Sequence, residues 1–315
     1  MTTISRRRMS FPLLALAVGA VGCCVAMIAG LPLAGPTATS LACFMLLLFG
    51  LPHGTLDLEL IKTQASGPAT GIASLLAIYL GLAAAMFGLW QAAPVLALLS
   101  FIVVATAHFS EDWYGAGSRF LETGMALSLL SAPTLMHRGA LDEIFVALTG
   151  RTEATVIADM LTLVMPVAIV VGIAAMVALW AAGHRVKASA GALSLASMIV
   201  LPPIIGFALF FCLFHSPRHL AESFRGVDLS PQTAGVRVVL PLTAAAAGIA
   251  AAIYGLNLRT DVAAGLIASS FTTLSILTVP HMAAPMFVAH LSRANAVSPT
   301  RVGDLIEESA AQVRR

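Results

Sequence analysis

Residues 156–182, VIADMLTLVMPVAIVVGIAAMVALWAA, decide the fold class of this chain. The stretch holds one charged side chain, Asp159, and it ends just before the polar residues His184 and Arg185. An α-helix rises about 1.5 Å per residue, so about 20 apolar residues cross a hydrocarbon core that is ~30 Å thick. We therefore expect a membrane-spanning helix at this position.

The rest of the chain follows the same pattern. Of its 315 residues 59% are hydrophobic and 10% are charged, whereas a typical soluble protein has roughly 25% charged residues. The long apolar runs argue against a transmembrane β-barrel, whose strands alternate in hydrophobicity over ~10 residues. We predict an all-α, polytopic transmembrane helical bundle of about 8–9 helices, from apolar runs at residues 11–34, 39–53, 71–90, 93–109, 120–136, 156–182, 189–214, 236–256 and 262–289.

No connection between these runs is long enough for a soluble domain, so we expect a single integral membrane domain over residues 1–315. A polar tail, residues 292–315, follows the last run. The N-terminal tail, residues 1–10, contains three consecutive arginines, and the positive-inside rule places it in the cytoplasm of a protein in the cell membrane. The next run has 24 residues, more than the ~7–15 of a signal peptide, which favours a first spanning helix.

The charge pattern excludes one class of partner. The formal net charge is +2, and the arginine triplet at residues 6–8 is the longest basic run in the chain. A nucleic-acid-binding surface needs a concentrated basic patch, so we expect no nucleic-acid partner. Membrane lipid, or a molecule dissolved in it, is the expected partner.

Four histidines interrupt the apolar sequence. They are His53, His108, His215 and His281, and apolar residues precede each of them over several helical turns. An ionisable side chain within a membrane is energetically costly and therefore indicates function. We expect these histidines to meet near the midplane of the membrane, where they would surround a metal ion. His219 follows His215 by four residues, a spacing that presents two imidazoles to one ion.

Carboxylates follow these histidines closely. Asp57 and Asp112 each come four residues after a histidine, and Glu111 and Glu222 each come three residues after one. Residues three or four apart share a helix face, and a metal-bound imidazole usually donates its other ring N–H to a carboxylate. We expect these four acids, together with His281, to surround and orient the ligands.

Prolines stand beside three of the histidines, at Pro52, Pro217 and Pro280. Proline removes a helical hydrogen bond and kinks the helix, so the sequence predicts kinks that aim the histidines at one centre. A further pair, Pro202-Pro203, interrupts the run at 189–214. We expect that run to be two helices, the second beginning at Pro203.

A simpler interpretation exists for any one of these histidines. A single histidine in a membrane helix often serves as a hydrogen-bond partner for a neighbouring helix. Four histidines in similar contexts, with acids nearby, favour a shared metal centre instead. The remaining histidines, His137, His184 and His290, lie in polar connections or at the end of a run, so we expect them at the membrane interface.

Imidazole ligands suit several metals, namely zinc, copper, iron and nickel. Neutral imidazoles leave a divalent ion its full charge, and they can leave positions open for another ligand. This arrangement suits Fe(II) that binds O₂, and a catalytic zinc stays open as an alternative.

The motifs as a set resemble a known family. They are Pro52-His53-Gly54-x-x-Asp57, His108-Phe109-x-x-Asp112, His215-Ser216-x-Arg218-His219 and Pro280-His281-Met282. This combination, over residues 52–282 of a polytopic membrane protein, is similar to the Brp/Blh family of β-carotene 15,15′-dioxygenases. The four blocks together are specific, although each block alone is weak.

The resemblance implies a function. It implies that Fe(2+) and O₂ cleave β-carotene at its central double bond into two molecules of all-trans-retinal, with a rhodopsin as a retinal acceptor. The iron-binding histidines of the family correspond to His53, His108, His215 and His219, and the role of His281 stays open.

Two other classes of function stay open from the residues alone. The first is a membrane di-iron desaturase or hydroxylase, which typically needs about eight clustered ligands, more than the histidines at suitable positions here. The second is a metal or proton transporter that uses the histidines as a relay. Metal content and turnover would distinguish all three.

Overall fold

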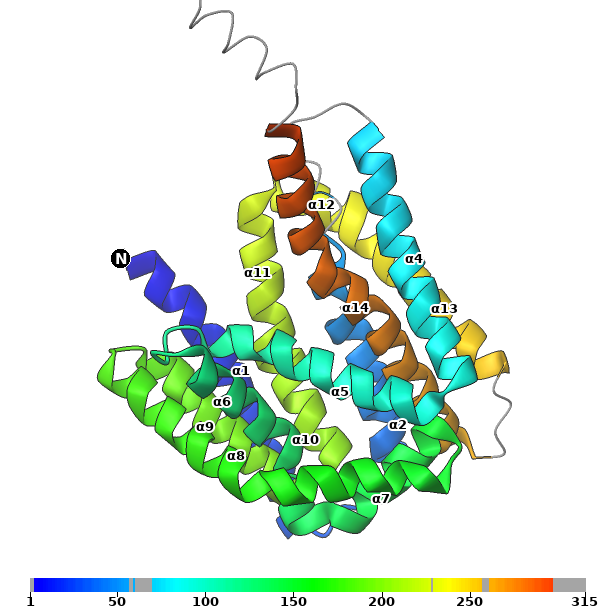
Figure 1. The fold of residues 1–315 in the computed structure, drawn as a ribbon. Coiled ribbons are helices and arrows are strands. Elements are labelled where there is room, and N and C mark those ends of the chain that lie inside the picture. The colour runs from blue at the N-terminus through cyan, green and yellow to red at the C-terminus, as the bar shows by residue number, and fades with distance from the viewer. Residues whose placement is uncertain (1–2, 57–58, 60–69, 228, 257–260, 297–315) are drawn as a thin grey trace, which may run out of the picture.

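The computed structural model describes residues 3–56, 59, 70–227, 229–256 and 261–296, with side chains for all of these except residues 3–10, 51, 53, 70–72, 75 and 284–296. All regular elements within these residues are helical, which confirms the predicted all-α bundle. In Figure 1 helix α5 crosses the face toward the viewer, helices α6, α8 and α9 lie together on its left, and α4, α13 and α14 lie on its right.

The α-helices are α1 (Thr3–Ile28), α2 (Pro36–Met45), α4 (Thr70–Ala92), α5 (Pro94–Ser110), α6 (Arg119–Ser131), α7 (Thr134–Thr149), α8 (Thr155–Ala181), α9 (Arg185–Val200), α10 (Pro203–Phe210), α11 (Ser216–Gly226), α12 (Pro231–Ala234), α13 (Leu240–Leu256) and α14 (Val262–Ala296). Short 3₁₀ segments are η2 (Leu51–Gly54), η3 (Glu111–Trp113) and η4 (Thr152–Ala154). Short π-helical segments are η1 (Leu46–Gly50), η5 (Phe211–His215) and η6 (Gly235–Val239).

Six helical segments of the described chain are long and apolar enough to cross a membrane, so this is a multi-pass membrane protein. They are Phe11–Ile28, Pro94–Trp113, Thr152–Ala181, Pro203–Gly226, Pro231–Leu256 and Val262–Ala283. Two shorter apolar helices accompany them, at Pro36–Gly50 and Leu76–Ala92. The predicted count of 8–9 helices therefore needs correction. One reason is that the run at 120–136 forms α6, whose 13 residues fall short of the about 20 that a span requires.

The chain breaks between α9 and α10, as the paired prolines predict. Leu201 ends α9 in an extended conformation, and α10 begins at Pro203. A residue before proline avoids the helical conformation, and proline favours the first position of a helix because it lacks an N–H. The expected helix start at Pro203 is confirmed.

Helix geometry also changes just before His215. The N–H of Ser216 donates to the carbonyl of Phe211, five residues earlier, which closes the π-turn η5. Pro217 follows and has no N–H to continue the α-helical ladder. Around Pro52 the chain forms η1 and η2, whereas α14 continues as one helix through Pro280. A continuous helix can still bend at a proline, so the kink at Pro280 stays a prediction.

Small residues let α6 and α8 approach closely. A Cβ atom added at Gly172 of α8 would lie 2.5 Å from the Ser128 hydroxyl oxygen of α6, and one added at Gly124 would overlap Val171. Interfaces between membrane helices favour small residues because their backbones can then come together. This close contact helps to hold the scaffold that carries α5.

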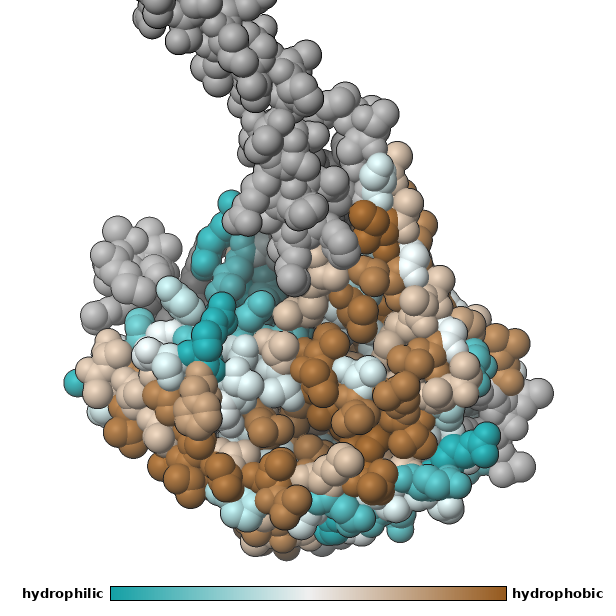
Figure 2. Space-filling model, viewed as in Figure 1, coloured by the Kyte–Doolittle hydropathy of each residue, from teal (hydrophilic) through white to brown (hydrophobic). Residues whose placement is uncertain are grey.

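The surface in Figure 2 is mainly apolar, with the hydrophilic residues of this face gathered along α11 and again near its lower edge. The face over α5 is brown in that view. A lipid-facing surface has this apolar character, because no hydrogen-bonding partner is available in hydrocarbon. The polar residues of α11 mark the end of the bundle where the histidines lie.

Candidate metal centre

Four histidines from three parts of the chain meet in one cluster. His108 is in the last turn of α5, His215 ends η5, His219 is one turn further on in α11, and His281 is in α14. The ring centroid of His108 lies 4.7 Å from that of His215, 5.2 Å from that of His219 and 5.1 Å from that of His281. The structure therefore brings together four of the five predicted histidines, which we call the histidine cluster.

The fifth histidine, His53, lies in η2 with its side chain outside the described part of the structure, and Asp57 lies outside the described residues altogether. The backbone around His53 is nevertheless close to the cluster, since η2 packs against α11 and α14. The hydroxyl of Ser216 also donates to the carbonyl of Phe49, at 2.6 Å. This contact fixes the segment before η2 against the start of α11.

Two ring nitrogens face each other inside the cluster. Nε2 of His215 lies 3.0 Å from Nε2 of His108, and both residues are almost fully buried. Nδ1 of His215 lies 2.7 Å from Oδ2 of Asp112 and donates to that carboxylate, which leaves the lone pair of a neutral imidazole on Nε2. A proton or a cation between the two Nε2 atoms satisfies this arrangement.

Asp112 therefore supports a different histidine from the one that precedes it in the chain. Its carboxylate is completely buried in η3 and reaches across to His215 of η5, and its Oδ1 lies 3.4 Å from Nε2 of His219. Asp112 lies just beyond the end of α5, in η3, and both its carboxylate and the imidazole of His108 reach His215. The carboxylate still holds a ring N–H in the way a ligand histidine needs.

Arg218 is a residue of this site that the sequence analysis quoted in a motif without giving it a role. Its Nη1 donates to Oδ1 and to the carbonyl oxygen of Asp112, both at 2.8 Å. Its Nε donates to Oε1 of Glu222 at 3.0 Å, a contact between residues four apart on α11. A buried carboxylate needs charged or polar partners, and Arg218 supplies them for Asp112. The signal available in the sequence was an arginine placed between two candidate histidine ligands.

The other two predicted acids lie at the rim of the cluster. Oε2 of Glu111 is 3.9 Å from Nδ1 of His108, and about half of the Glu111 side chain is exposed. Glu222 is similarly exposed, and it forms an ion pair with Arg218. Both acids therefore lie on the exposed side of the site.

A half-buried lysine adds positive charge beside these acids. Lys187 of α9 donates from Nζ to the carbonyl of Tyr114 at 2.7 Å. Burial lowers the pKa of Lys187 below its usual range, and nearby Arg218 lowers it further, whereas Asp112 and Glu222 oppose this effect. The site thus places two cations, Arg218 and Lys187, around the buried Asp112.

Phenylalanine rings surround the histidines. The ring of Phe211 stacks on that of His215 with centroids 5.1 Å apart, and the ring of Phe109 meets it edge-on at 4.9 Å. Phe210 lies 5.9 Å away on the same histidine. These rings exclude water from the inner side of the cluster, which strengthens its electrostatic interactions.

The donor atoms fit a transition-metal ion. Ligand atoms of Asp112, His215 and His219 all lie within 4.8 Å of one another. The 3.0 Å between the Nε2 atoms of His108 and His215 is the separation of two nitrogens that bind one ion at right angles, each about 2.1 Å from it. Several imidazoles with a buried carboxylate suit iron, zinc, copper or nickel.

Two of the three histidines predicted at the interface, His137 and His184, lie outside the cluster. Nε2 of His137, at a kink near the start of α7, lies 3.2 Å from the carbonyl oxygen of Val200. His184 is exposed just before α9. The side chain of His290 is outside the described part of the structure.

Comparison with known proteins identifies the family. The family model described as "Beta-carotene 15,15'-dioxygenase" matches residues 44–286, a range that includes every histidine of the cluster. A "Beta-carotene 15,15'-dioxygenase" from an uncultured marine bacterium, 66A03, is 28% identical over 256 residues, which are 76% of this chain and 89% of that protein. No solved structure is significantly similar to this chain.

A second relative comes from Halobacterium salinarum and is named "Probable beta-carotene 15,15'-dioxygenase Blh". It is 27% identical over 327 aligned positions, which cover 90% of this chain and 94% of that protein. Both relatives are thus matched over most of their length, and the family model covers more than half of this chain. The chain therefore belongs to the beta-carotene 15,15'-dioxygenase family and is an oxidoreductase.

Proposed function

We propose that this protein cleaves β-carotene with O₂ at the central 15,15′ double bond and releases two molecules of all-trans-retinal. Family membership supports carotenoid cleavage as the activity and favours it over the desaturase and the transporter. The single observation that carries the proposal is the buried cluster of His108, His215, His219 and His281, set among phenylalanine rings inside a membrane bundle. A C40 carotenoid dissolves in hydrocarbon, so it reaches such a site from the bilayer.

The proposed metal is Fe(2+), held by His53, His108, His215 and His219. Iron fits the donor set, and when bound it supplies the site at which O₂ is activated. We propose His281 as a neighbour of His108 that helps to shape the site without binding iron. Asp57 is proposed to orient His53, as Asp112 holds His215.

This chain's own residues hold the site in place. Asp112 keeps a proton on Nδ1 of His215, which directs the Nε2 lone pair inward. Arg218 balances the negative charge of Asp112 and is itself held by Glu222. The rings of Phe109 and Phe211 keep water away from the histidines.

The cellular setting belongs to the same proposal. We place the protein as one integral domain of residues 1–315 in the cell membrane, with its N-terminus in the cytoplasm and the metal site near the midplane. Membrane lipid surrounds it, and a rhodopsin is the proposed acceptor of retinal. These features rest on the sequence pattern and on the family resemblance.

Pigment analysis in cells that make β-carotene tests the reaction. Cells that also express this protein should lose β-carotene and accumulate retinal, because the carotenoid and the enzyme share the membrane. The His215→Ala variant, expressed at the same level, is the matched control. Longer apocarotenals as the main product would overturn the central position of the cut. Unchanged β-carotene with iron-loaded protein in the membrane would overturn the substrate.

A further inference from the structure

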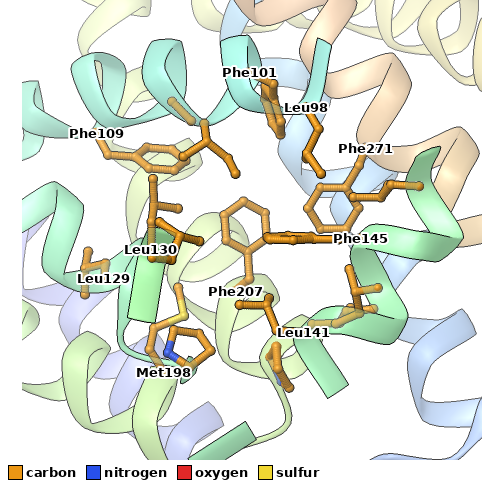
Figure 3. Close-up of a pocket in the computed structure, with 18 residues that line it drawn as sticks. Leu98, Phe101, Phe109, Leu129, Leu130, Leu141, Phe145, Met198, Phe207 and Phe271 are labelled. Atoms are coloured by element: carbon orange, nitrogen blue, oxygen red, sulfur yellow. The ribbon is translucent and has the colours of Figure 1, made fainter. Parts of the chain in front are cut away.

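An apolar cavity of about 90 Å³ lies behind the histidine cluster. Side chains from α5, α6, α7, α10 and α14 surround it, and Figure 3 shows Phe109, Leu129, Phe207, Phe271, Phe145 and Leu141 around the central space. All the residues that line it are hydrophobic. A water molecule needs about two to four polar partners, so this cavity favours an apolar occupant.

One aromatic ring separates the cavity from the histidines. Phe109 lines the cavity, and its ring also contacts that of His215, with centroids 4.9 Å apart. Phe207 lines the cavity as well and stacks on Phe211, which in turn stacks on His215. A molecule held in the cavity is therefore one side chain away from the candidate metal centre.

The size of the cavity selects among apolar molecules. An engineered cavity of about 150 Å³ accommodates benzene or xenon, so a cavity of about 90 Å³ is small for a six-carbon ring. Half of a β-carotene molecule has twenty carbons, more than this space encloses, so most of it would lie outside the cavity. A diatomic gas is close in size to water, whose share of liquid volume is about 30 Å³, and it fits easily.

We propose that this cavity is a holding site for O₂ beside the metal centre. O₂ is small, apolar and a poor hydrogen-bond acceptor, so it leaves water for an apolar space. The proposal rests on the proposed function, in which O₂ is a substrate of the adjoining site. The cavity supplies O₂ from the side of Phe109 and leaves the rest of the site to the carotenoid.

Filling the cavity tests the proposal, with xenon as the probe of a small apolar gas. The Leu141→Phe variant enlarges a buried cavity residue of α7, 6% exposed, and Leu135→Phe makes the same change at a 51% exposed position of the same helix. Ala105→Leu fills the cavity from α5 and serves as a second variant in case the first does not fold. Full-length protein in lipid nanodiscs is titrated with xenon by ¹²⁹Xe NMR.

We expect saturable xenon binding in the unmodified protein and in Leu135→Phe, and a loss of it in Leu141→Phe and Ala105→Leu. In steady-state turnover the two filled variants should have a KM for O₂ raised about threefold or more, with kcat at saturating O₂ and the KM for β-carotene unchanged. This pattern would mean that the filled variants bind O₂ more weakly while the chemical step is unchanged.

Two results would overturn the holding site. The first is equal xenon binding in the unmodified protein and in both filled variants. The second is a change in the KM for β-carotene, or in the position of the cut, with the KM for O₂ unchanged, which would assign the cavity to the carotenoid. If the unmodified protein does not cleave β-carotene, the proposed function fails, and the xenon titration still decides whether the cavity binds a small apolar gas.

Discussion

The histidines divide into two groups that a substitution to alanine should separate. We expect alanine at His53, His108, His215 or His219 to abolish activity and iron retention, because each removes a proposed ligand. Alanine at His137 or His184 should be nearly silent, since those imidazoles lie outside the cluster. His290, predicted at the interface, should behave like them. Metal content by mass spectrometry and retinal yield are the measurements.

An equal loss across both groups would mean that these histidines support folding and not the metal. The yield of folded protein, measured by size-exclusion chromatography, checks this for each variant. His281→Ala is informative in the same series: a lower rate with full iron content agrees with a neighbour of the ligands, and a loss of iron adds it to the ligand set.

The carboxylates that we propose orient the ligands should have graded effects when they are replaced. We expect Asp112→Asn to lower the rate or the iron affinity by about 10- to 100-fold, which is the usual scale for a residue that holds a metal-bound histidine. The carboxylate accepts from Nδ1 of His215 with one oxygen and from Arg218 with the other. The amide of asparagine has a single oxygen and no charge, so it loses one of these two contacts. Asp57→Asn is expected to show the same range. Unchanged iron retention and rate in both variants would contradict this role.

Arg218 gives a sharper test of the same arrangement. We expect Arg218→Gln to weaken iron binding by about tenfold, because it removes the cation that donates hydrogen bonds to the buried Asp112. Arg225→Gln changes an exposed arginine on the same helix and is the matched control. Iron affinity is measured by competition with a chelator. If the two variants retain iron equally well, Arg218 does not position Asp112.

At the scale of the elements, a glycine-to-alanine substitution should have opposite effects inside the contact between α6 and α8 and at an open position elsewhere. Gly172→Ala places a methyl group against Ser128 and should destabilise the protein by about 1–3 kcal/mol, the usual range for overpacking. Gly88→Ala, on α4, meets no atom within 4 Å and should be neutral or stabilising, because alanine favours helix over glycine. Thermal unfolding in detergent compares the two. A Gly172→Ala protein as stable as Gly88→Ala would show that the helices can separate at little cost.

For the whole molecule, the metal content distinguishes the candidate functions. We expect about one iron per chain in protein purified in mild detergent, since the described residues form one candidate group of ligands. Retinal should appear at about two molecules per β-carotene consumed, with a dependence on O₂ and suppression by an iron chelator. Two irons per chain would favour the desaturase, and one zinc without iron would remove the oxygenase.

Much of the architecture could be predicted from sequence because its causes are local. Apolar runs and hydrocarbon thickness predict spanning helices whatever the rest of the chain does. Pro203 begins a helix because proline lacks an N–H and its neighbour avoids the helical conformation. The kink expected at Pro280 stays a prediction, because a membrane helix can accommodate a proline without ending there, as α14 does.

The sequence by itself determined which residues are candidates for a metal site, because an ionisable side chain within an apolar run is costly and therefore indicates function. Only the tertiary structure decided how they pair. Asp112 holds His215, 103 residues away, and not the histidine four residues before it. The placement of Arg218, the approach of His281 and the apolar cavity behind Phe109 likewise depend on which helices pack together. Local periodicity shows which face of a helix is buried, whereas the neighbour on that face is chosen by long-range packing.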